Sequence, residues 1–263
     1  FVLVGRCKPL SILPIHRLME YSARSDRSPL DNHRGYTLIE LVVVLVIIGI
    51  LATVAMKSLT AANETARTEE TKQELTRIAY AISGDPNLIS GGHRTDFGFI
   101  GDNGRLPSNL DDLVSAPAGY ANWQGPYISD DYTAGGAGVE YRNDAWGRAY
   151  GYTGGLTVTS TGGPSALTRT LANSTDDLLR NSASFTFTDL DFTPPGMDYR
   201  DSLRFTLFYP SNGVITSRTG LPSADGFLAF DSVPIGLHTL EVVYLPDNDT
   251  LTRKVSITPG QDY

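Results

Sequence analysis

Residues 34–56 read RGYTLIELVVVLVIIGILATVAM, and this stretch decides how the chain is organised. No charged residue occurs from Leu41 to Met56. Counted from Tyr36, the run to Met56 has 21 residues, which corresponds to about 31 Å of α-helix at roughly 1.5 Å per residue. The hydrocarbon core of a bilayer is about 30 Å thick. The stretch therefore predicts a membrane-spanning helix.

Basic residues precede the apolar stretch. They include Arg17, Arg24, Arg27 and Arg34. Because the cytoplasmic flank of a membrane helix carries the excess of Lys and Arg, we expect the N-terminus to lie in the cytoplasm. The chain after Met56 is then expected on the other side of the membrane, which makes this a single-pass protein.

Two ordinary explanations compete for the apolar stretch, a secretory signal peptide and a simple membrane anchor. The run is longer than the usual apolar core of a signal peptide, and no small-x-small cleavage site follows it before a strongly helical stretch. A simple anchor leaves Glu40 unexplained. A carboxylate inside an apolar run is costly, so it is by default a functional residue with a partner.

Residues 34–41, RGYTLIEL, together with the Val/Ile run that follows, resemble the class III signal of type IV pilins and type II secretion pseudopilins. In that family a dedicated peptidase cuts after the glycine and methylates the new N-terminus. The resemblance implies a cleaved leader, residues 1–35, ending at Gly35, and a methylated Tyr36. Pilins usually begin with Phe, and they commonly have a proline where this chain has Lys57.

The resemblance also implies that Glu40 pairs with the terminal amine of a neighbouring subunit. An amine with an ordinary pKa of ~7.7–8.0 is mostly cationic at neutral pH. Pairing it with a carboxylate in the apolar core of a filament offsets two desolvation penalties. The implied partners are other copies in a helical filament, the prepilin peptidase and an inner-membrane assembly platform. The globular part is expected in the periplasm, or outside the cell in an assembled filament.

The helix is expected to cover residues 36–83. No Gly or Pro occurs from Lys57 to Ser83, and residues 84–86, GDP, end the run because proline cannot continue a helix. An apolar face follows the helical rhythm. It consists of Leu75, Ile78, Ala79 and Ile82. Charge pairs at i,i+3 spacing predict a solvated face. They are Glu64/Arg67, Glu69/Lys72 and Glu74/Arg77.

Three motifs after the helix resemble the globular domain of the major pseudopilin of type II secretion. Residues 102–107 read DNGRLP, residues 123–128 read WQGPYI and residues 144–152 read DAWGRAYGY. That family typically reads D-x-G-x-x-P, W-x-G-P-Y and D-P-W-G-x-P-Y-x-Y, so Ala145 and Ala149 replace two prolines. The resemblance implies a small pseudopilin-type β-domain over residues 84–183, with the long helix packed on it.

Pseudopilins of this kind bind one calcium ion in a loop after the last motif. Calcium takes six to eight oxygen ligands. The positions that match the family's ligands are Ser160, Asp176 and Asp177. The alternative is that the two adjacent aspartates are simply solvated or cap a helix.

The pattern becomes strand-like near Ser184. Leu203, Phe205, Leu207 and Tyr209 alternate with other residues, which is typical of a strand. An earlier strand is expected to carry apolar side chains as far as Leu190 and Phe192. Residues 212–242 resemble the carboxypeptidase-regulatory-like, transthyretin-like β-sandwich. Residues 184–263 are therefore expected to form an all-β sandwich that ordinary major pseudopilins lack, and the whole chain an α+β protein.

Composition and missing motifs exclude other classes of function. A net charge of -8 argues against nucleic-acid binding. A lone cysteine, Cys7, and four histidines exclude an intramolecular disulfide and a Cys/His zinc site. No nucleophile elbow, P-loop, HExxH or nucleotide fingerprint is present, so we expect no enzyme. The sequence predicts a structural filament subunit that serves protein transport. The alternative is a minor pilin or adhesin that displays a ligand-binding sandwich.

Overall fold

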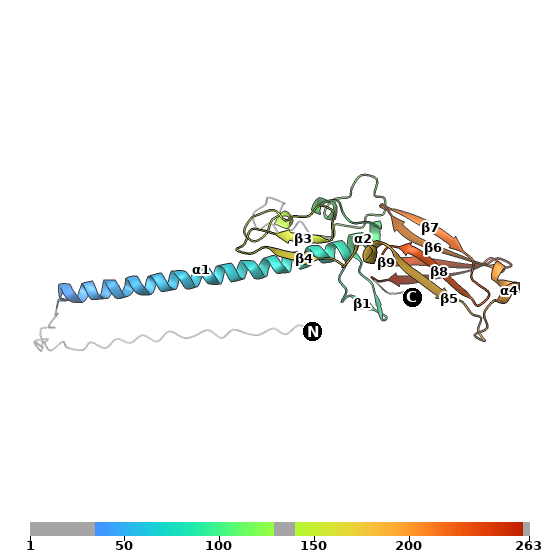
Figure 1. Cartoon of the computed structure of the whole chain (residues 1–263), viewed down its shortest axis with the longest axis horizontal. Helices are drawn as coiled ribbons and strands as arrows, with labels where there is room; N and C mark the ends of the chain where they lie inside the picture. Colours follow the sequence, from blue (N-terminus) through green and yellow to red (C-terminus); the bar gives the residue numbers. More distant parts are fainter. Residues whose placement is uncertain (1–34, 129–139, 260–263) are drawn as a thin grey trace, which may run out of the picture. The chain divides into compact units, whose positions relative to one another are not determined.

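The computed structural model describes residues 35–128 and 140–259. The basic residues and most of the expected leader, residues 1–34, lie outside the described residues. The contacts divide the chain into a unit that ends at Val54 and a unit that begins at Ala55. Helices and antiparallel strands are both present, which confirms the α+β class (Figure 1).

Helix α1, Leu38–Ser83, is one continuous helix of 46 residues. It is long and apolar enough to cross a membrane. The helix begins two residues later than expected because Thr37 caps it: the Thr37 Oγ1 accepts a hydrogen bond from the Glu40 backbone N–H at 3.3 Å. It runs without a break through Lys57, where the family commonly has proline.

The end of α1 at Ser83 is where the sequence predicts it. Gly84 takes a positive φ of 83°, and its N–H donates to the Tyr80 carbonyl at 2.7 Å. A Cβ atom at Gly84 would lie 2.2 Å from the Asp96 carbonyl oxygen. Only glycine fits this helix end, because both the backbone conformation and the space forbid a side chain.

The second half of α1 supplies one wall of the first hydrophobic core. The four expected apolar residues of this face are all buried. Short elements follow over the next hundred residues, and several of them contribute buried residues to this core. These elements are β1 (Ile89–Ser90), β2 (His93–Arg94), α2 (Gly98–Asn103), η1 (Leu110–Leu113), η2 (Glu140–Arg142), β3 (Thr157–Ser160), β4 (Leu167–Thr170) and α3 (Thr175–Leu179).

The remaining strands form two sheets with a second core between them. One sheet pairs β5 (Asn181–Thr186) with β8 (Phe227–Val233). The other has the order β10-β9-β6-β7, with bounds Asp249–Ile257, Gly236–Tyr244, Leu203–Ser211 and Val214–Gly220. The four alternating residues predicted from the sequence are buried along β6. Two short helices, α4 (Gly196–Tyr199) and η3 (Arg200–Ser202), precede β6.

The first strand of this region is shorter than expected. β5 ends at Thr186, and Leu190 and Phe192 lie outside it with 98% and 85% of their surface exposed. The cause is Asp189, whose Oδ1 accepts hydrogen bonds from the N–H groups of Asp191 and Thr193 and closes a turn. The prediction that these two apolar side chains belong to a strand is therefore wrong.

One end of the strands of the second core packs against the first core. The Gly213 N–H donates to the Asn103 carbonyl at 2.8 Å, and the Ile235 N–H donates to the Leu178 carbonyl at 2.9 Å. Ile235 itself is fully buried in the first core. Figure 1 shows α4 at the other end of the strands. The boundaries predicted for the individual domains stay predictions.

Candidate functional site

The predicted processing junction lies just ahead of α1. Gly35, Tyr36 and Thr37 are not helical, and Tyr36 is 82% exposed. A Cβ atom at Gly35 would meet nothing within 4 Å. A peptidase needs its scissile bond in an accessible, non-helical segment, and this junction provides one.

Glu40 lies in the first turn of α1 and is exposed in the single chain. A carboxylate at this position is favoured by the partial positive charge of the helix N-terminus. The apolar side chains that follow it are also exposed, for example Val42 at 43% and Leu51 at 63%. This surface needs a bilayer or neighbouring subunits to cover it. The pairing of Glu40 with a neighbour's amine stays a prediction.

Residues 144–152 fasten the first core to α1 through side chains of the helix. The Trp146 Nε1 donates to Glu64 Oε2 at 3.0 Å, and the Tyr150 hydroxyl donates to Glu74 Oε2 at 2.5 Å. Glu69 pairs with Lys72 at 3.2 Å, as expected for a solvated pair. The sequence interpretation missed the role of Glu64 and Glu74, because their aromatic partners lie 82 and 76 residues away.

Asp144 organises this motif from within. It is only 5% exposed, and its carboxylate accepts bonds from the Trp146, Arg148 and Gly162 N–H groups and from the Ser160 hydroxyl. Burial opposes ionisation of Asp144, but the four hydrogen bonds outweigh it and hold its pKa below the usual value. Asp144 is the first residue of the DAWGRAYGY motif, but nothing in the spacing of that motif indicates this role.

The three residues expected to bind calcium have other partners. Ser160 Oγ donates to Asp144 Oδ2 at 2.6 Å. Asp177 forms a capping box with Ser174 at the start of α3. Asp176 forms an ion pair with Arg180, with 3.5 Å between Asp176 Oδ1 and Arg180 Nε. Within residues 35–128 and 140–259, no group of three or more His, Cys, Asp or Glu side chains could hold a metal ion. Calcium binding by Ser160, Asp176 and Asp177 stays a prediction.

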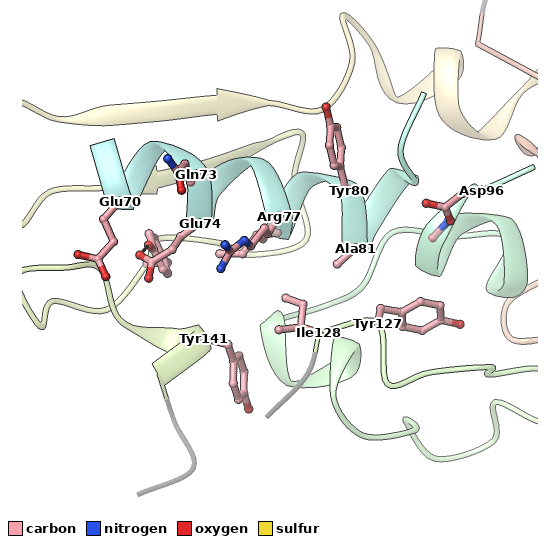
Figure 2. A pocket seen from close by; sticks show the side chains of 13 residues that line it. Glu70, Gln73, Glu74, Arg77, Tyr80, Ala81, Asp96, Tyr127, Ile128 and Tyr141 are labelled. Atoms are coloured by element: carbon pink, nitrogen blue, oxygen red, sulfur yellow. Dashed lines mark hydrogen bonds between the residues drawn. The ribbon is translucent and has the colours of Figure 1, made fainter. Parts of the chain in front are cut away.

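A cavity of about 550 Å³ lies beside the second half of α1. Glu70, Glu74 and Arg77 line it from the helix, and Tyr141 and Ile128 line it from the opposite side (Figure 2). Burial raises the pKa of Glu74, and the nearby charge of Glu70 adds to this effect. Residues from distant parts of the chain line this cavity, so no sequence motif indicates it.

Comparisons with known proteins agree with the residues at the junction. Residues 30–56 match the family model of the prokaryotic N-terminal methylation motif. The chain is 30% identical over 118 residues to the type II secretion system core protein G of Xanthomonas campestris pv. campestris. The match covers 45% of this chain and 66% of that relative, just under two thirds of its length. No solved structure matches the chain significantly.

Proposed function

The chain belongs to the type IV pilin and pseudopilin family, and from this we propose that it is a structural subunit of a type II secretion pseudopilus or a related filament. The main support for the proposal is the methylation motif, which overlaps the start of one continuous helix. The family is one of structural subunits, so the proposed role needs no catalytic residue.

Assembly follows from the chemistry of the N-terminal segment. Cleavage after Gly35 frees an amine at Tyr36, four residues before Glu40. In a filament the exposed apolar surface of α1 is covered by neighbouring helices, where unpaired charges are costly. The Glu40 carboxylate and a neighbour's amine then stabilise each other only when the two helices have the correct axial offset. The pair therefore fixes the alignment of neighbouring subunits in the filament.

Before assembly the same helix anchors the subunit in the inner membrane. The basic residues ahead of Gly35 favour a cytoplasmic N-terminus, which leaves the part of the chain after the helix in the periplasm. Prepilin peptidase and an inner-membrane assembly platform are the partners that this route requires.

The first test concerns processing. We expect the mature protein to begin at Tyr36 and to carry one added methyl group on its amine. Intact-mass measurement and N-terminal sequencing of the protein from membrane fractions check this. An untrimmed leader, or a mature start beyond Met56, contradicts the proposed function.

A further inference from the structure

The cavity beside α1 combines three kinds of lining residue that suit one class of ligand: a carboxylate end, tyrosines and an apolar floor. Figure 2 shows Glu70 and Glu74 on the side of the helix that faces Tyr141 and Ile128. We propose that it binds a cation on an aliphatic stem, meaning an ammonium or guanidinium group such as an arginine side chain carries. The cavity is lined by none of the residues at the processing junction. The inference therefore goes beyond the filament role and does not depend on it.

The carboxylate end is formed by Glu70 and Glu74, one helical turn apart on α1. Glu74 is half-buried, and burial raises its pKa, with repulsion from Glu70 and Asp144 acting in the same direction. The Tyr150 hydroxyl and the charge of Arg77 act against this without cancelling it. Glu74 is thus a partly desolvated carboxylate. Among the described residues that line the cavity, Glu70, Glu74 and Asp96 outnumber the basic residue Arg77, so the lining still attracts an incoming cation.

The walls are aromatic. Four tyrosines contribute, namely Tyr80, Tyr127, Tyr141 and Tyr150. Burial raises the pKa of Tyr127, Tyr141 and Tyr150, so these rings stay neutral at physiological pH. The faces of neutral aromatic rings attract cations within about 6 Å of the ring centre.

The floor is apolar and fits a stem. Ile78, Ala81 and Ile128 also line the cavity. A lysine or arginine side chain has this division, because its methylene stem packs on apolar surface while its head carries the charge.

Other ligand classes fit less well. An anion is repelled by Glu70 and Glu74. A wholly apolar ligand would displace water from Glu70 and Glu74 and would offer these carboxylates no hydrogen bond or charge in return. For a metal ion, the described residues provide no group of three or more His, Cys, Asp or Glu ligands.

The experiment uses the mature full-length chain in detergent micelles, with binding followed by calorimetry. Agmatine represents a free cation, and N-acetyl-arginine methylamide represents a protein side chain. N-acetyl-citrulline methylamide has nearly the same shape without the charge. We expect the cationic probes to bind at least tenfold more tightly than the citrulline probe. Binding of agmatine alone identifies a free cation as the source, and binding of the arginine amide shows that a side chain can enter. Equal binding of citrulline, or no binding of either cation, overturns the proposal.

Variants on the same helix locate the site. Glu74→Gln should weaken binding at least tenfold, whereas Glu69→Gln should not, because Glu69 is exposed, pairs with Lys72 and does not line the cavity. Glu74→Gln also alters the hydrogen bond that Glu74 accepts from Tyr150. Glu70→Gln is therefore a second variant, because the Glu70 side chain is exposed and its substitution leaves that hydrogen bond in place. Thermal unfolding confirms that each variant is folded. Affinity that survives both cavity substitutions overturns the proposal.

The pH dependence has a definite sign. A cation binds the ionised form of Glu74, so affinity should fall as pH drops through the pKa of this residue. Because that pKa is raised above 4.5, the loss should begin at a higher pH than for an ordinary glutamate. The other groups that affect Glu74 are Glu70, Arg77, Asp144 and Tyr150. In Glu74→Gln this part of the pH dependence should disappear, and its persistence contradicts the assignment.

Discussion

Asp144 is a single residue that four hydrogen-bond donors surround, two of them more than ten residues further along the chain. Asp144→Ala should destabilise the mature protein by about 2–4 kcal/mol, because buried donors then lose their acceptor. Denaturant unfolding measures this. Asp198→Ala is the control, since Asp198 is exposed on α4 and its substitution should change stability by less than about 0.5 kcal/mol.

The charge of Asp144 also gives stability a pH dependence. Its folded pKa lies below 3.8, so the stabilisation is present above pH 3.8 and is lost as pH falls toward the lower, folded value. Asp144→Asn should remove this part of the acid sensitivity. An unchanged acid unfolding curve in Asp144→Asn would show that the four hydrogen bonds do not hold the ionised form.

Glu40 is the residue on which assembly is expected to depend. Glu40→Gln should leave membrane insertion intact, because it removes a costly charge from the apolar segment. It should lower filament yield at least tenfold, because the neighbour's amine loses its ionic partner. Shearing filaments from cells and quantifying the subunit measures the yield, with Glu69→Gln as a matched control. Normal yield from Glu40→Gln refutes the pairing.

At the scale of elements, helix α3 distinguishes two interpretations of the adjacent residues Asp176 and Asp177, a helix cap and a calcium site. Asp177 accepts a hydrogen bond from the Ser174 backbone N–H in a capping box, so Asp177→Ala should lower the free energy of unfolding by about 0.5–1.5 kcal/mol whether or not calcium is present. The calcium prediction requires more. Melting must be higher in millimolar calcium than in chelator, and Ser160→Ala must abolish the difference. A melting temperature that calcium does not change leaves the helix cap as the whole role of Asp177.

The elements differ in how far the sequence predicts them. α1 was predictable because its periodicity and its glycine–proline end are local signals. The end of β5 was not, because the turn depends on Asp189 Oδ1 bonding two N–H groups, which outweighs the apolar alternation through Leu190 and Phe192. The bonds of Glu64 and Glu74 were also beyond reach, since each partner is brought in by the tertiary fold. The junction residues were readable because their signature is contiguous.

At the scale of the whole molecule, the second core is formed largely by its own strands, and the stability of a fragment that contains it depends on the residue at which the fragment begins. Ala183 is fully buried in that core, and it lies one residue before the predicted boundary at Ser184. A fragment of residues 180–263 should therefore unfold cooperatively and melt higher than a fragment of residues 184–263, which lacks half of β5. Circular dichroism on heating compares them. Equal melting temperatures would mean that the start of β5 contributes nothing to this core.

The turn closed by Asp189 holds Leu190 and Phe192 out in the solvent, with Phe192 at a positive φ of 61°. A filament of many subunits repeats this turn once per copy. A ligand that carries several copies of a binding group would then contact several copies of the turn at once. Such linked contacts can raise the overall affinity about 10²–10⁴-fold over that of one contact. The turn is thus a natural place to graft a foreign peptide when the aim is avidity rather than high affinity per copy.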